Sequence, residues 1–169
     1  MSRAKVPATD ELDSIARSLE LRPDGTVVWR TASGRRSAGC LAGTLGRDGY
    51  VEVKINKSRH KAHRIAWYLH YGVWPVAWLD HVNSNRTDNR ISNLREASSL
   101  QNARNRKSYT GKSSGYKGVS WSKRNSRFVA KIVVNGKQIH LGYHKDEELA
   151  SLIYEEASLK YFGEFSASR

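Results

Sequence analysis

A segment almost without apolar side chains, residues 108–115, constrains the fold of this chain more than any other feature. It consists of Ser, Thr, Gly and Lys, with Tyr109 as its one large side chain. Such a composition buries too little surface to form a packed element and is typical of a linker. The chain has 169 residues, enough for two small domains. The sequence therefore predicts two modules, with residues 108–114 as the linker and a second module at 115–169.

The part before the linker is predicted to combine helices with short strands. Residues 9–20 have an apolar stripe at helical spacing, with Thr9 as the expected N-cap and acidic side chains in the first turn. We treat residues 1–20 as an N-terminal helical segment and residues 21–107 as the first module. Periodicity and turn residues predict strands at 26–30 and 50–55, with a turn at 56–59 into a partner strand through His60 and Lys61. They also predict a helix at 62–71, an extended segment at 76–82 and a mainly helical segment at 91–106.

Beyond the linker the pattern changes to strands. Residues 118–121, 127–134 and 137–142 are predicted strands, and Asn135-Gly136 is a strong signal for a tight hairpin between the last two. Three acidic residues at 146–148 then open a predicted helix that runs to about residue 161 and has one apolar face. The second module is therefore predicted to be a three-stranded antiparallel sheet packed on one helix, and the whole chain to be an α+β protein.

The charge of the chain indicates its partner. Lys and Arg number 29 and Asp and Glu number 16, so the net charge is +13. From residue 97 to 145 there are eleven basic residues and no acidic ones. A surface that only needs to be soluble normally mixes the two signs. Because such an excess attracts polyanions, nucleic acid is the first candidate partner and an anionic membrane surface the second.

Two further observations concern the compartment. No apolar run approaches the roughly 18 residues of a membrane span, and no apolar stretch follows the basic N-terminus as in a secretory signal. Cys40 is the one cysteine, which excludes an intrachain disulfide and a cysteine-rich zinc site and fits a reducing compartment. We therefore expect no membrane association and a location in the cytoplasm.

The chemistry of the chain is expected where Asp80 precedes His81. A carboxylate next to a histidine offers a hard oxygen ligand and a general base of near-neutral pKa. Asn93 and Asn102 are nine residues apart, about 2.5 turns of a helix, so they would point in different directions and suit two distinct roles. Six of the nine asparagines lie between residues 83 and 105, so an Asn at one offset alone is weak evidence. Asn83, Asn85 and Asn89 are better explained as turn formers.

Residues 79–95, together with Gln101-Asn102, resemble the HNH endonuclease family in its phage-type branch. The spacing is twelve residues from His81 to Asn93 and nine more to Asn102. The flanking residues 62–67 and 93–95 are also similar to that branch, and the resemblance covers about residues 21–107. It implies a ββα-metal fold and metal-dependent cleavage of DNA, nicking one strand or cutting both.

The same resemblance implies a role for each residue. Asp80 would bind a divalent metal, and His81 would deprotonate the attacking water. Asn93 would hydrogen-bond and orient the His81 ring, and Asn102 would be the second metal ligand where many members have a histidine. An oxygen ligand at that place favours Mg²⁺ or Mn²⁺ over zinc. His63 is expected either to support this site or to be a structural helix residue, and His60 and His70 to be surface or partly buried residues.

The second module resembles the APETALA2/ERF-type DNA-binding domain, on residues 116–119, Trp121, 130–132, 140–143 and the helix that follows. The resemblance covers about residues 115–165 and implies a sheet that lies in the major groove of double-stranded DNA. Ser120 and Val133 stand where arginines are usual, and His140 stands where a tryptophan is usual, so base specificity does not transfer. The predicted DNA-contacting residues are Lys117, Trp121, Lys123, Arg124, Arg127, Lys131, Gln138 and His140.

The basic residues around the linker either follow the DNA backbone or form a solvated tether; they are Arg104, Arg106, Lys107 and Lys112. The combination of modules predicts a homing-type endonuclease of the kind that bacteriophages carry, acting in the host cytoplasm as a monomer or a homodimer. The alternatives are a non-catalytic DNA-binding regulator with a degenerate nuclease fold and a protein that binds or cleaves RNA.

Overall fold

The structure is a computed structural model that describes residues 6–34, 36–104 and 113–166. It divides into two compact units, residues 1–99 and 100–169, and each unit is considered by itself below. Residues 108–112 of the predicted linker and three of the four basic residues assigned to it lie outside the described residues, as does the side chain of Arg104. The last two linker residues are described: Ser114 is buried, and the Ser113 hydroxyl accepts a 3.0 Å hydrogen bond from the Trp121 amide.

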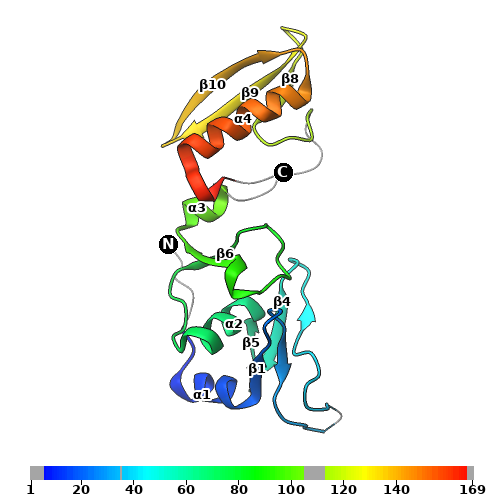
Figure 1. The fold of residues 1–169 in the computed structure, drawn as a ribbon, viewed down its shortest axis with the longest axis vertical. Helices are drawn as coiled ribbons and strands as arrows, with labels where there is room; N and C mark the ends of the chain where they lie inside the picture. The colour runs from blue at the N-terminus through cyan, green and yellow to red at the C-terminus, as the bar shows by residue number, and fades with distance from the viewer. Residues whose placement is uncertain (1–5, 35, 105–112, 167–169) are drawn as a thin grey trace. The chain divides into compact units, whose positions relative to one another are not determined.

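The first unit consists of short elements that form three small antiparallel sheets (Figure 1). One sheet pairs β1 with β2, the second has the order β3–β4–β5, and the third pairs β6 with β7. The elements in chain order are α1 (Thr9–Ser18), β1 (Leu19–Leu21), β2 (Val27–Trp29), β3 (Thr44–Leu45), β4 (Val51–Ile55), β5 (Ser58–Lys61), α2 (Ala62–Tyr71), β6 (Trp78–His81), the 3₁₀ turn η1 (Ile91–Asn93) and β7 (Leu94–Ala97). Helix α3 (Ser99–Arg104) begins at the last residue of this unit, and its other residues belong to the second unit.

The core of this unit joins the two longer helices to β4. Ile15 of α1, Val53 of β4 and Ile65 of α2 are completely buried, and they belong to one apolar cluster. The N-terminal helix is therefore part of the first core. Helix α2 coincides with the predicted helix and ends at Gly72, which has a positive φ of 74°, the usual way for a helix to stop. It follows β5 directly and carries His63 in its first turn.

Two predicted elements of this unit differ in the structure. The predicted helix at 91–106 is wrong over its first half, because Leu94–Ala97 form strand β7, which pairs with β6. The two end residues of β7, Leu94 and Ala97, are buried, and the antiparallel pairing of all four β7 residues with β6 outweighed the local helix propensity. The predicted helix at 9–20 ends at residue 18, because Leu19 joins β1. Its N-cap is Ala8 and not Thr9.

The second unit confirms the predicted sheet and helix. Strands β8 (Val119–Ser122), β9 (Arg127–Val134) and β10 (Lys137–His144) pair antiparallel in the order β10–β9–β8, and α4 (Glu147–Phe162) follows, with the short turn η2 (Gly163–Phe165) after it. The side chain of Asp146 caps α4 by accepting a 2.8 Å hydrogen bond from the Leu149 amide. Ala130 of β9 and Ala150 of α4 are completely buried in one cluster.

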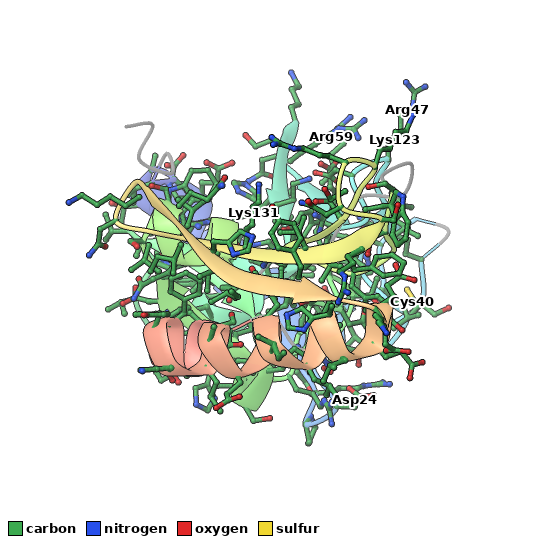
Figure 2. The ribbon with its side chains drawn as sticks, turned by 90° about the horizontal axis from the view of Figure 1, so that it is seen from above. Asp24, Cys40, Arg47, Arg59, Lys123 and Lys131 are labelled. Atoms are coloured by element: carbon green, nitrogen blue, oxygen red, sulfur yellow. The ribbon has the colours of Figure 1, made fainter. Side chains whose placement is uncertain are left out.

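Strand register separates the two faces of this sheet. Lys131 pairs with His140, Val133 with Gln138 and Ser122 with Arg127. The predicted DNA-contacting residues Arg127, Lys131, Gln138 and His140 therefore share one face, and Figure 2 shows Lys131 on the side of the sheet away from α4.

The prediction for Trp121 is wrong with respect to its face. It pairs with Phe128, and the centroids of the two rings lie 4.8 Å apart. Phe128 is two residues from buried Ala130 on β9, so Trp121, which lies opposite Phe128, is on the same face as Ala130. Trp121 thus sits at the edge of the helix-covered face, where its ring packs against Phe128 and stays 40% exposed.

Candidate active site

The β6–β7 hairpin places the Asp-His pair at the buried end of a strand. Asp80 lies opposite Arg95 and His81 lies opposite Leu94. Both Asp80 and His81 are buried, with 5% and 3% of their surface exposed. Polar groups at this depth require partners, so the contacts around the two side chains define what the site can do.

Asp80 forms a buried ion pair with Arg95. Two guanidinium nitrogens, Nε at 3.1 Å and Nη2 at 2.9 Å, donate to the same carboxylate oxygen, Oδ2. The exposed fractions of the two side chains are 6% and 13%. Because a buried charge is costly without a counter-charge, Arg95 is the partner that makes a carboxylate tolerable at this depth.

The His81 ring is held by Asn89. Its Nε2 lies 3.1 Å from Oδ1 of Asn89; since an amide oxygen only accepts, Nε2 donates. In that neutral tautomer Nδ1 is the basic nitrogen of the ring. Burial lowers the pKa of His81, while the bond to Asn89 and the charges of Asp80 and Asp88 act in the opposite direction. The result is a neutral imidazole at neutral pH, the form that accepts a proton.

Asn93 organises the loop between the two strands. Its Oδ1 accepts from the backbone amide of Asn83 at 3.0 Å, and its Nδ2 donates to Asn83 Oδ1 at 3.0 Å and to the backbone oxygen of Asp88 at 2.8 Å. The predicted hydrogen bond between Asn93 and the His81 ring is therefore replaced by the bond that His81 Nε2 donates to Asn89. Because Asn93 lies at the end of η1, its amide faces the loop, where it ties residue 83 to residue 88.

The other loop asparagines divide into two kinds. Asn83 Oδ1 accepts from the amide of Asn85, and Asn85 Oδ1 accepts from the amide of Thr87, so both are turn formers as predicted. Asn89, predicted to be the same, is buried against His81. No local pattern separates Asn89 from its neighbours. Asn89 is buried because of the path of the loop, which the hydrogen bonds of Asn93 to residues 83 and 88 hold in place.

A glycine of the first unit fixes the place of this loop from outside the hairpin. Gly25 has a φ of +84°, and a Cβ there would lie 2.2 Å from the backbone nitrogen of Arg90 and 2.5 Å from the carbonyl carbon of Asn89. The turn between β1 and β2 thus packs directly on the backbone that presents Asn89. A side chain at residue 25 has no room without moving this segment.

Two aromatic residues complete the surroundings of His81. The His63 ring lies edge-on at 5.2 Å between centroids, and the Tyr50 ring lies 5.8 Å from His81 and 5.1 Å from His63. Burial, and to a smaller extent the neighbouring His81 and Arg64, lowers the pKa of His63 to about 3. His63 is therefore a neutral ring that supports the site from α2.

The donor set around Asp80 fits a magnesium-like ion better than zinc. Within the described residues there is no group of three His, Cys, Asp or Glu side chains that could hold a metal, and structural zinc needs about four such ligands. Mg²⁺ usually takes one or two protein carboxylates together with waters and substrate phosphates. Asp80 supplies one carboxylate. Asn102 lies on α3 and belongs to the second unit, so its role as second ligand stays a prediction.

The predicted DNA-contacting side chains of the second unit differ in exposure. The half-buried ones are Lys117 and Lys131, and burial lowers the pKa of Lys117. The exposed ones are Trp121, Lys123, Arg124, Arg127, Gln138 and His140.

None of the helices in the described part of the chain is long and apolar enough to cross a membrane.

Comparison with known proteins agrees with this geometry. Residues 60–104, which run from β5 to α3, match the family model described as HNH endonuclease. A protein named an uncharacterized HNH endonuclease, from Acanthamoeba polyphaga mimivirus, is 34% identical over 125 residues, which make up 73% of this chain and 64% of that protein. Protein 3.8 of Escherichia phage T7 is 30% identical over 109 residues, 60% of this chain and 87% of that protein. No solved structure matches the chain.

Proposed function

We propose that this chain is an HNH endonuclease, the family that its residues 60–104 match, and that it hydrolyses phosphodiester bonds in double-stranded DNA with Mg²⁺ or Mn²⁺. The observation that carries the proposal is the buried Asp80-His81 pair, in which Asn89 holds the neutral imidazole of His81 and Arg95 pairs with the carboxylate of Asp80. A base and a hard oxygen ligand side by side are what metal-assisted hydrolysis of a phosphodiester requires.

In this mechanism His81 is the general base. Its Nε2–H is bonded to Asn89, so Nδ1 accepts the proton of the attacking water. Asn89 keeps the ring in one tautomer and orientation, and Asn93 acts one step further away by closing the loop that carries Asn89. Asp80 would hold the metal ion, which when bound supplies positive charge at the phosphate.

The second unit is proposed to be the DNA-binding part. Support comes from the three-stranded sheet with a helix on one face and with Arg127, Lys131, Gln138 and His140 together on the other. A ribbon of this width fits the major groove, where Arg and Lys contact phosphates or guanine edges. The resemblance to APETALA2/ERF-type domains leads to the same assignment, and Trp121 is left out of the contact surface.

A homing-type role belongs to the same proposal. The relatives come from a bacteriophage and a giant virus, and a nuclease joined to a separate DNA-binding module suits an enzyme that cuts one site in a foreign genome. Such an enzyme would act in the cytoplasm of the host. Mapping the cleavage positions on both strands of host DNA tests this role. A homing enzyme cuts at a unique site, whereas a scavenging nuclease cuts at many sites without a preferred one.

A second candidate, a non-catalytic DNA-binding regulator, is favoured by one observation. Arg95 already occupies Oδ2 of Asp80, the carboxylate expected to bind metal. A plasmid-nicking assay with Mg²⁺ and with EDTA separates the candidates. We expect relaxed or linear plasmid with Mg²⁺, none with EDTA, and none from the His81→Ala variant. Cleavage that is equal for His81→Ala and the wild type, or absent from both, excludes the proposed enzyme mechanism.

A further inference from the structure

The loop that carries Asn89 also carries two arginines with different surroundings. Arg90 is bound to a carboxylate: Nε donates to Asp88 Oδ1 at 2.8 Å and Nη2 donates to Asp88 Oδ2 at 2.6 Å. Arg86 has no carboxylate among the described residues. Its Nη1 donates to the backbone oxygen of Asp48 at 2.7 Å, and its guanidinium carbon lies 5.0 Å from the centre of the Tyr50 ring.

Tyr50 connects Arg86 to the reaction centre. The same ring that carries the guanidinium lies 5.8 Å from the ring of His81, so only one aromatic side chain separates the exposed cation from the base. The two anchors, one hydrogen bond and one ring face, restrict a side chain that otherwise has many rotamers. The guanidinium is thus held in place before any ligand arrives.

The acidic groups nearest to Arg86 are engaged by other cations. Lys61 bonds to both Asp48 Oδ2 and Glu52 Oε1, at 2.5 and 2.7 Å, and Glu52 Oε2 also pairs with Arg59 at 3.3 Å. Two acids and two bases balance in this group. Arg86 therefore adds a surplus positive charge to the surface beside His81, at an exposed position.

A surplus, preorganised guanidinium beside a hydrolytic base is suited to one kind of ligand. Phosphate oxygens accept two parallel hydrogen bonds from the planar fork of an arginine. They also carry a negative charge, and Arg86 has no carboxylate partner of its own among the described residues. Tyr50 and the Asp48 carbonyl oxygen use one face of the group and one nitrogen. The remaining donors of the five on a guanidinium stay available for such a ligand.

We propose that Arg86 binds a backbone phosphate of the DNA strand being cut, with Tyr50 as the platform that sets the guanidinium, and thereby the strand, against His81. This assignment rests on the proposed nuclease function and adds a residue that touches the substrate. A single arginine–phosphate contact contributes one phosphate to the counterion release on binding, so its loss is visible in binding without any cleavage.

The experiment measures DNA affinity as a function of salt in EDTA, and cleavage rates separately in Mg²⁺. For Arg86→Gln we expect the slope of log K against log salt to fall by about 0.9 in magnitude, and kcat/KM to fall about 10- to 100-fold. Arg86→Lys should restore the slope but only part of kcat/KM, because an ammonium makes a point contact without the fork. Tyr50→Leu should reduce kcat/KM while leaving the slope close to that of the wild type.

Arg90→Gln is the matched control in the same loop. Because Arg90 is paired with Asp88, its loss should leave the salt slope unchanged. A slope for Arg86→Gln equal to that of the wild type, or an equal drop for Arg90→Gln, overturns the proposal. Circular dichroism and Tm of each variant show whether the loop remains folded. The two proposals fail in different assays: wild type that never nicks plasmid contradicts the nuclease function, whereas the slope in EDTA tests the phosphate contact by itself.

Discussion

The β6–β7 hairpin and the β8–β10 sheet are both antiparallel, yet they place their polar residues in opposite ways. In the hairpin, Asp80 and His81 point inward and their partners come from positions eight and fifteen residues away, Asn89 and Arg95. In the sheet, Arg127, Lys131 and His140 share the face opposite the helix, and strand register alone brings them together. Chemistry therefore depends here on a buried set of mutual contacts, whereas binding depends on a repeated surface. Substitutions in the two regions should therefore differ in the size of their effect and in the property that they change, either cleavage and stability or DNA binding.

The largest effect is expected from Asp80→Ala. Removing the carboxylate deletes the proposed metal ligand and the counter-charge that Asp80 supplies to the buried Arg95 guanidinium, so cleavage should fall at least about a thousandfold and stability by about 3–5 kcal/mol. DNA binding in EDTA should change little, because the second unit is intact. Plasmid nicking, urea unfolding and a binding titration measure the three quantities. Parallel loss of binding and cleavage would argue against a ligand role.

Asn89→Ala is expected to have the next largest effect. The buried Nε2 of His81 loses its acceptor, which should cost about 1–3 kcal/mol of stability and lower kcat about 10- to 100-fold by freeing the tautomer and the ring. The matched control is Asn85→Ala, an exposed turn former of the same loop, expected to change stability by less than about 1 kcal/mol. If the two variants have equal kcat values, Asn89 does not position the base.

The basic face should affect binding but not the chemical step. The double variant Arg127→Gln/Lys131→Gln should lower the salt slope of DNA binding by about 1.8, two phosphates' worth, and raise KM, while kcat at saturating DNA stays within about twofold. Trp121→Ala serves as comparison, because its ring packs on Phe128 and its loss should lower Tm more than affinity. A slope that does not change for the double variant would remove this face from the DNA interface.

The last prediction concerns the pH dependence of stability. The pKa of His63 is about 3 in the folded protein against a usual 6.5, so the unfolded chain binds the extra proton first as the pH falls. Stability is therefore full above pH 6.5 and declines below it, by about 1.4 kcal/mol per pH unit until about pH 3.

Comparing the wild type with His63→Gln tests this dependence. Urea unfolding at pH 7 and at pH 5 should show a smaller pH effect in the variant. The exposed His70 provides the control, and His70→Gln should keep the wild-type pH dependence. A pH effect that is unchanged in His63→Gln would show that other groups cause it.

Local patterns were sufficient for several elements. The helix at 62–71 was predicted to the residue because its apolar spacing ends at a glycine. The strands of the second unit and their Asn135-Gly136 turn were predicted within two residues, because alternation and turn chemistry act over short distances. The segment at 94–97 was predicted wrongly for the converse reason: its state depends on β6, far away in the chain.

The amino-acid sequence by itself determined the basic character of residues 97–145 and the adjacency of Asp80 and His81, because charge and adjacency do not depend on folding. The division of the chain into units falls at residues 99 and 100, before the predicted linker. Tertiary structure decided which groups the Asp80 and His81 side chains meet. Asn89 rather than Asn93 reaches the ring, Arg95 neutralises the carboxylate, and Tyr50 sets Arg86 beside the base. Burial is the physical reason: a polar group removed from water takes the nearest partner in space, and that partner is chosen by the loop path and the strand register.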